Sequence, residues 1–292
     1  FSSLSLCFSA LMSAPQNVDE TLLYSVAGSQ FVAKTMTALD ALKVPYKVVY
    51  VDFLKLKQQT VPPHTVPQMR WRGDMLTDSS DILKRVDQDC TEAPFKLYPA
   101  AQKKEIEELE QHAGTILHGH VIYYTWWIEN GFQETIVKYI TAQYWPLPSF
   151  LVYPIMQMTM DVGRMRGASR KKARGILGES LIPQGRDPKP EEEENMTESL
   201  LKQFRELDAR FASESQQWLC KTEQPSAADF SVYGMVERLV GTNGDAGMGI
   251  VAPWLWAEAN TPKLKAWYER MREAYPIQFK GKAEECKVWA KA

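Results

Sequence analysis

The chain has 292 residues, of which 45% are hydrophobic and 24% charged, and its formal net charge is -2. This composition is that of a folded protein long enough for two domains, and it excludes disorder throughout. The charge gives no general attraction to nucleic acid or to an acidic membrane, and the four scattered cysteines predict neither a disulfide framework nor a zinc site and favour a reducing compartment.

The amino-terminal residues 1–11 are apolar and rich in serine, and the chain begins with Phe1. Two interpretations stay open: the tail of a targeting segment, or a fragment whose natural start is Met12. We expect residues 1–20 to form a leader or an unstructured extension. The expected compartment is the cytoplasm, or an organelle if residues 1–11 belong to a targeting segment.

Residues 21–90 alternate between strand-like and helix-like segments. Strands are expected at 21–26 and 46–51, with a helix at 31–42 between them. Two further strands follow around Val66, and Asp78 opens a second helix. The order β-α-β and then β-β-α predicts a small α/β domain.

One stretch of this domain has the pattern of a small-ligand site. Pro67 cannot donate to a strand ladder, so Val66-Pro67 marks an edge or bend where main-chain groups are free to meet an extended ligand. At the helix start, Ser79 and free N–H groups suit a carboxylate, and Asp78 suits an ammonium group. A ligand with a peptide bond, an amine and a carboxylate fits this set, and a glutathione-like tripeptide is the obvious candidate.

From Leu97 onward the pattern is helical, and Pro99 suits a first helical turn. Residues 183–196 are rich in proline and glutamate and are expected to form a charged, solvated loop. Further helices are expected to start at a capping box formed by Asn195 and Glu198, at a reciprocal cap formed by Ser226 and Asp229, and at Thr261-Pro262.

Together these motifs resemble the glutathione transferase superfamily over most of residues 21–277. Ser29 and the residues after it resemble the family's active-site turn, Val66-Pro67 its cis-proline signature, and Asp78-Ser79 its acidic-Ser pair. Tyr98-Pro99 resembles the entry to the family's helical domain, and residues 225–230 resemble the start of the central helix of that domain.

The resemblance implies a thioredoxin-like α/β N-terminal domain at residues 21–90 that binds glutathione, followed by an all-α helical domain at residues 97–292. Ser29 would promote the glutathione thiolate, which is the nucleophile. Val66 and Pro67 would meet the tripeptide backbone, and Asp78 and Ser79 would hold its γ-glutamyl end. The implied function is a glutathione transferase that acts on an apolar electrophile, with glutathione as a substrate and a homodimer as the assembly.

The sequence departs from the family pattern at two places. Gln30 stands where the family usually has proline, and residues 51–65 are shorter than usual, so the helix there is expected to be reduced or absent. A non-catalytic relative that binds a partner or a membrane surface is therefore the alternative. It is also motivated by a basic run of Arg164, Arg166, Arg170, Lys171, Lys172 and Arg174.

Two aromatic residues at one-turn spacing, Tyr123 and Trp127, are candidates for an apolar substrate pocket, and core packing is the alternative. His118 and His120 are two residues apart, so on a helix they point to different sides, and no metal is expected.

Neither a nucleic-acid partner nor a spanning helix is expected. The apolar stretch at residues 145–160 is broken by prolines, while attachment to a membrane surface stays open.

Overall fold

The computed structural model describes residues 20–26, 28–52, 55–127, 162–182, 189–213, 215–241, 252 and 254–279. The expected N-terminal extension lies outside these ranges apart from Glu20, as do residues 183–188 of the expected charged loop. The apolar stretch at residues 145–160 is outside them as well.

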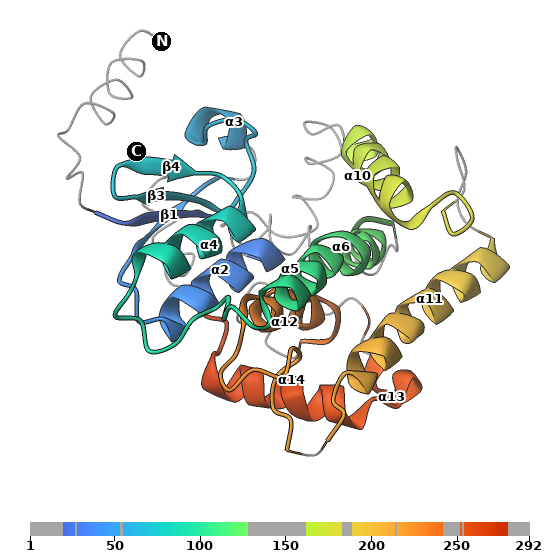
Figure 1. Ribbon diagram of the computed structural model, residues 1–292. Coiled ribbons are helices and arrows are strands. Elements are labelled where there is room, and N and C mark those ends of the chain that lie inside the picture. The colour runs from blue at the N-terminus through green and yellow to red at the C-terminus, as the bar shows by residue number, and fades with distance from the viewer. Residues whose placement is uncertain are drawn as a thin grey trace, which may run out of the picture.

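The first part of the chain forms a small α/β domain (Figure 1). Its elements are β1 (Leu22–Ser25), α2 (Gln30–Ala41), β2 (Lys47–Tyr50), α3 (Leu56–Gln59), β3 (Gln68–Trp71), β4 (Asp74–Leu76) and α4 (Ser79–Asp89). The predicted order β-α-β and β-β-α is confirmed. The helix α3 has only 4 residues, as expected for the short segment before Pro67.

The four strands form one mixed sheet in the order β2-β1-β3-β4. The strand β1 is parallel to β2 and antiparallel to β3, and β3 is antiparallel to β4. Helices α2 and α4 pack together and against the sheet, where Leu23, Met69 and Ile82 are fully buried (Figure 1). This arrangement is the thioredoxin-like domain that the sequence predicts.

The second part of the chain is helical. A continuous helical rod contains α5 (Lys103–His112), the π-helical turn η2 (Ala113–Leu117), α6 (His118–Ile122) and a second π-helical turn η3 (Tyr123–Trp127). It is followed by α10 (Val162–Leu177), α11 (Pro190–Ala209), α12 (Ala227–Val240), α13 (Leu255–Ala259) and α14 (Pro262–Ala274). Among the described segments, no helix combines the length and the apolar character that a bilayer crossing needs.

Two expected helix starts differ from the structure. Pro99 lies in a turn, and α5 begins only at Lys103. The charged stretch is helical from Pro190, so the predictions of a loop through residue 196 and of a helix start at Asn195 are wrong. Pro190 is favoured in a first helical turn, three glutamates beside the positive helix end are stabilising, and the Glu192 carboxylate accepts from the Lys189 N–H at 2.7 Å.

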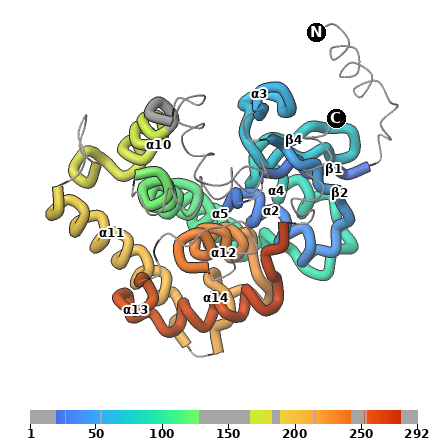
Figure 2. The backbone as a smooth tube through the Cα atoms, turned by 180° about the vertical axis from the view of Figure 1, so that it is seen from behind, coloured from blue at the N-terminus to red at the C-terminus, as the bar shows by residue number. Residues whose placement is uncertain are grey.

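The helix α12 occupies the middle of the helical domain, between α5 and α14, and also packs against α2 of the first domain (Figure 2). Its start is the predicted reciprocal cap, in which the Ser226 N–H and hydroxyl both donate to the Asp229 carboxylate. The close approach of α12 to α2 is made at Gly234, where an added Cβ would lie 2.5 Å from the Gln30 carbonyl oxygen. Thus α12 fixes the position of α2 relative to the helical domain.

Candidate functional site

The predicted ligand-contacting residues come together at one edge of the sheet. Tyr24 pairs with Gln68, so Val66-Pro67, just before Gln68, lies beside the carboxyl end of β1. That end leads into Ser29 and α2. Leu76 pairs with Met69, and Asp78 follows two residues later at the same end. The antiparallel register therefore gathers Ser29, Val66-Pro67 and Asp78.

Ser29 is the N-cap residue of α2. Its backbone is extended, with φ -77° and ψ 120°, and its hydroxyl oxygen accepts a hydrogen bond from the Val32 N–H at 3.4 Å. Because the side chain is only half-buried and the oxygen is the acceptor in this bond, the hydroxyl proton is free to point to a ligand. The positive end of α2 lies at the same place.

Val66-Pro67 forms the second side of the edge. The peptide bond between the two residues is cis, Pro67 is buried and Val66 is half-buried. The next side chain, Gln68, holds the preceding loop through two hydrogen bonds with the backbone of Val61, at 2.6 and 3.0 Å. The main chain before β3 is therefore held in place from both sides.

Asp78 and Ser79 form the third side, at the start of α4. Asp78 is exposed and caps the helix, because one of its carboxylate oxygens accepts from the N–H groups of Ser80 at 2.8 Å and Asp81 at 3.3 Å. Ser79 is only 5% exposed. The α4 start therefore presents a carboxylate at the surface and a hydroxyl beneath it.

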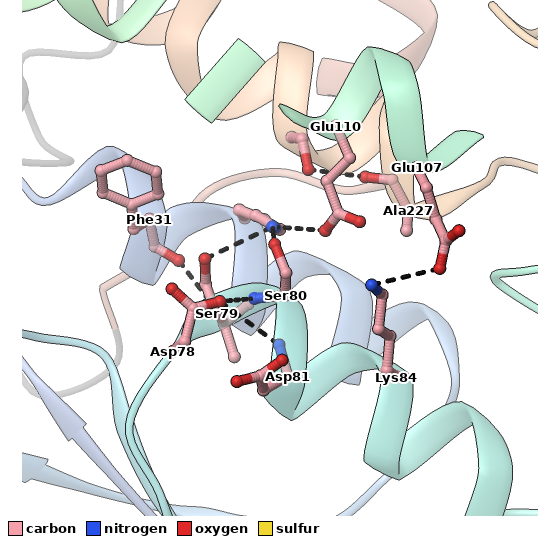
Figure 3. Close-up of polar contacts among 12 residues, drawn as sticks. Phe31, Asp78, Ser79, Ser80, Asp81, Lys84, Glu107, Glu110 and Ala227 are labelled. Carbon is pink, nitrogen blue, oxygen red and sulfur yellow. Dashed lines mark hydrogen bonds and ion pairs between the residues drawn. The ribbon is translucent and has the colours of Figure 1, made fainter. Parts of the chain in front are cut away.

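A buried ammonium group lies under the α4 start. Nζ of Lys34 donates to Oε1 of Glu110 at 2.6 Å, to the Ser80 hydroxyl at 2.9 Å and to the Ser79 hydroxyl at 3.3 Å. Figure 3 shows Ser79, Ser80 and Glu110 converging on this nitrogen. The second Glu110 oxygen accepts from the Tyr98 hydroxyl at 2.9 Å. This network joins α2 and α4 to α5.

Burial lowers the pKa of the Lys34 ammonium, and the adjacent Glu110 carboxylate counteracts the shift. Three acceptors within 3.3 Å favour the charged form, because hydrogen bonds to an ammonium group stabilise it. Burial and the same carboxylate raise the pKa of Tyr98, which remains a hydrogen-bond donor. The α4 start therefore lies above a buried ammonium group that is ion-paired with Glu110.

The residues that follow Ser29 contact the helical domain. The Gln30 side-chain nitrogen lies 2.9 Å from Nδ1 of His118, and the Phe31 and His118 rings meet edge to face with centroids 4.8 Å apart. Burial lowers the pKa of His118 to about 3, and Lys172 acts in the same direction. His118 is therefore neutral at physiological pH.

Tyr123 and Trp127, the predicted pocket residues, lie on η3 and are buried in the helical domain. Their ring centroids are 5.5 Å apart, and the Arg170 guanidinium lies 4.5 Å from the centroid of Trp127. Arg166 donates to the main-chain oxygens of Trp126 and Trp127 at 2.9 Å. These contacts are made with α10, and a pocket role for Tyr123 and Trp127 stays a prediction.

The two histidines of α6 point to different helices, as their spacing predicts. His118 meets Gln30 on α2, whereas Nε2 of His120 lies 3.1 Å from the Ser199 hydroxyl on α11. In the described ranges, no group of three or more His, Cys, Asp or Glu side chains is arranged to hold a metal ion.

Sequence comparison matches two segments of the chain to domains of one family. Residues 23–94 match the family described as glutathione S-transferase, N-terminal domain, and residues 190–270 match the glutathione S-transferase, C-terminal domain. No curated protein sequence matches the chain significantly.

Several solved structures have a similar fold. The beta-etherase LigF from Sphingobium sp. strain SYK-6 is 18% identical, with a TM-score of 0.55 over 93% of this chain and 99% of that one. A glutathione transferase homolog from Drosophila mojavensis, solved with bound glutathione, is 16% identical, with a TM-score of 0.51 over 93% and 96%. A glutathione transferase from Populus trichocarpa is 14% identical, with a TM-score of 0.52 over 87% and 95%.

Proposed function

Since the chain belongs to the glutathione S-transferase superfamily, we propose that it binds glutathione at the edge formed by Ser29, Val66-Pro67 and the start of α4. In this proposal the thiol of the bound tripeptide attacks an apolar electrophile. The observation that carries it is the convergence of these three segments on one edge, with the Lys34 ammonium beneath the α4 start.

The γ-glutamyl end of glutathione carries both an ammonium group and a carboxylate. The carboxylate fits the positive end of α4, with the Ser79 hydroxyl beside it and the Lys34 ammonium below. The ammonium group fits Asp78, which is exposed at the same helix start. In this arrangement each charged group of the γ-glutamyl end lies beside a group of opposite charge in the site.

The main chain at Val66 is proposed to pair with the tripeptide backbone. The thiol then lies near Ser29, whose hydroxyl proton is free to donate. A hydrogen bond from a hydroxyl, added to the positive end of α2, lowers the pKa of a thiol and raises the fraction of nucleophilic thiolate at neutral pH.

Two substitutions at Ser29 separate capping from catalysis. Ser29→Asn keeps a good N-cap but removes the hydroxyl, whereas Ser29→Thr keeps both. We expect Ser29→Asn to leave glutathione binding within about threefold and to lower turnover of 1-chloro-2,4-dinitrobenzene by about 100-fold, while Ser29→Thr retains most activity. Equal turnover in wild type and Ser29→Asn would contradict the role of the hydroxyl.

A homodimer, which the family resemblance implies, is part of the proposal and is checked by light scattering of the purified protein. The alternative function, attachment to a partner or membrane surface through the basic run, has less support. Arg166 and Arg170 are engaged with Trp126 and Trp127, which leaves Lys171 and Lys172 as the exposed cations of the described part of α10.

A further inference from the structure

The helix α12 carries a buried arginine that nothing in the described part of the chain neutralises. Arg238 is 6% exposed, and its Nε and Nη1 atoms make no hydrogen bond to any described residue. Burial lowers the pKa of its guanidinium to about 10, which leaves it charged at neutral pH. An unpaired buried charge is costly, so the Arg238 guanidinium needs an acceptor that no described residue supplies.

The packing of α12 against α2 places Arg238 at the Ser29 end of α2. Near the start of α12, Gln224 lines the same groove as Ala41, the last residue of α2. Further along, Gly234 abuts Gln30, the first residue of α2. The two helices are therefore antiparallel. Arg238 follows Gly234 by four residues, on the same face and about 6 Å farther along the axis, beyond the first turn of α2.

A second unpartnered donor lies at the same end of α2. The Gln30 side-chain nitrogen donates to Nδ1 of His118, so the imidazole proton is on Nε2. This Nε2 group is buried, and it has no hydrogen-bond partner among the described residues. His118 also touches Phe31, two residues after Ser29. A cation and a neutral N–H donor, from α12 and α6, thus flank the first turn of α2.

We infer that Arg238 and His118 form an anion subsite beside Ser29, which accepts a carboxylate of the electrophilic substrate. This assignment of substrate class rests on the proposed glutathione-dependent function. A carboxylate offers the guanidinium two acceptor oxygens and leaves a lone pair for the His118 N–H, so that it satisfies both donors. The preferred electrophile is then apolar in its body and anionic at one end.

Equilibrium binding of a matched pair of probes tests this subsite without requiring turnover. The pair is 3,5-dinitrobenzoate and neutral 1,3-dinitrobenzene, measured by calorimetry on the full chain with glutathione present. Wild type is expected to bind the benzoate at least tenfold more tightly. Arg238→Met should abolish that preference and leave binding of the neutral ring within about twofold, and Arg238→Lys should retain part of the preference.

Arg205→Met is the matched control, because Arg205 is an exposed arginine of α11 that is ion-paired with Glu198. It should leave the preference unchanged. Thermal melting supplies a second readout: without ligand, Arg238→Met should melt at or above the wild-type temperature, since an unpaired buried charge is removed. If Arg238 were purely structural, its loss would lower the melting temperature instead.

The inference is overturned if wild type does not distinguish the two probes, if Arg238→Met keeps the preference, or if the benzoate competes with glutathione and so occupies a carboxylate site of the tripeptide itself. A wild-type protein that keeps the preference but does not bind glutathione would support the anion subsite and refute the proposed function. The two failures are therefore distinguishable.

Discussion

Nζ of Lys34 lies 2.6 Å from Oε1 of Glu110, and both side chains are at least 96% buried, with exposed fractions of 3% and 4%. The pair joins α2 of the first domain to α5 of the second. Removing one member of a buried ion pair leaves the other charge without compensation. Because Lys34 also donates to Ser79 and Ser80, the same pair stabilises the domain interface and holds the start of α4 in place.

Lys34→Met is expected to lower the free energy of unfolding by ~3–5 kcal/mol, because Glu110 is then buried alone. The double variant Lys34→Met, Glu110→Met should recover much of the loss. Urea unfolding checks both. Lys84→Met is the control, since the Lys84–Glu107 pair at 3.1 Å is solvent-exposed (Figure 3) and worth ~1 kcal/mol or less. Equal losses in Lys34→Met and Lys84→Met would refute the structural role of the buried pair.

Asp78→Asn should weaken glutathione binding by about tenfold, or ~1.4 kcal/mol, since the side chain loses the charge proposed to hold the γ-glutamyl ammonium group. Asparagine is as good an N-cap as aspartate, so the melting temperature should change little. Asp81→Asn removes an exposed carboxylate from the same turn and serves as the calorimetric control. A similar loss of affinity in both variants would indicate a general charge effect only.

Gly234→Ala should destabilise the protein by ~1–3 kcal/mol, because the added methyl group would meet the Gln30 carbonyl oxygen at 2.5 Å and force α12 away from α2. Gly167→Ala is the matched control: no atom of the described residues lies within 4 Å of the added atom, and the site is inside α10. That change should stabilise by ~0.5–1 kcal/mol. Thermal unfolding of the two variants measures the difference, and opposite signs are predicted.

Acidification should destabilise the protein through its buried histidines. Burial lowers the pKa of His118 to about 3 and of His120 to about 4 in the folded state. Unfolded histidine titrates at ~6.5, so the unfolded chain binds the extra protons as pH falls from about 6.5 to 4. Each histidine then lowers the free energy of unfolding by up to ~1.4 kcal/mol for each pH unit of acidification. Above pH ~6.5 this loss is absent.

His120→Gln tests this account, because it should reduce the slope of unfolding free energy against pH between 6.5 and 4. His112→Gln, at a partly exposed position of α5, should leave the slope unchanged. If both variants keep the wild-type slope, the buried imidazole does not drive the acid sensitivity.

The α/β domain was predictable because its signals are local. Strand and helix periods differ, Pro67 interrupts a strand pattern, and Asp78 is a standard cap residue. In the helical domain, Ser226 gives the same kind of local signal. The start of α11 was missed because Pro190 and its glutamates resemble a solvated loop in composition. Only their position at a helix N-terminus makes these charges favourable, and that depends on where the helix packs.

The candidate site was predictable at Ser29, Val66-Pro67 and Asp78-Ser79, where motifs carry the information. The residues beneath it were not. Lys34 is separated from Glu110 by 76 positions, and Gln30 from His118 by 88, so no local pattern pairs them. The one available signal was a lysine inside the apolar face of a helix, which indicates a buried partner without naming it.

Calorimetric titration of the full chain with glutathione and with cysteinylglycine, which lacks the γ-glutamyl group, is the sharpest check on the proposed glutathione site. We expect glutathione to bind, and cysteinylglycine to bind at least tenfold more weakly, because the contacts at Asp78, Ser79 and the start of α4 are lost. Absence of glutathione binding, or equal affinity for the two peptides, would contradict it.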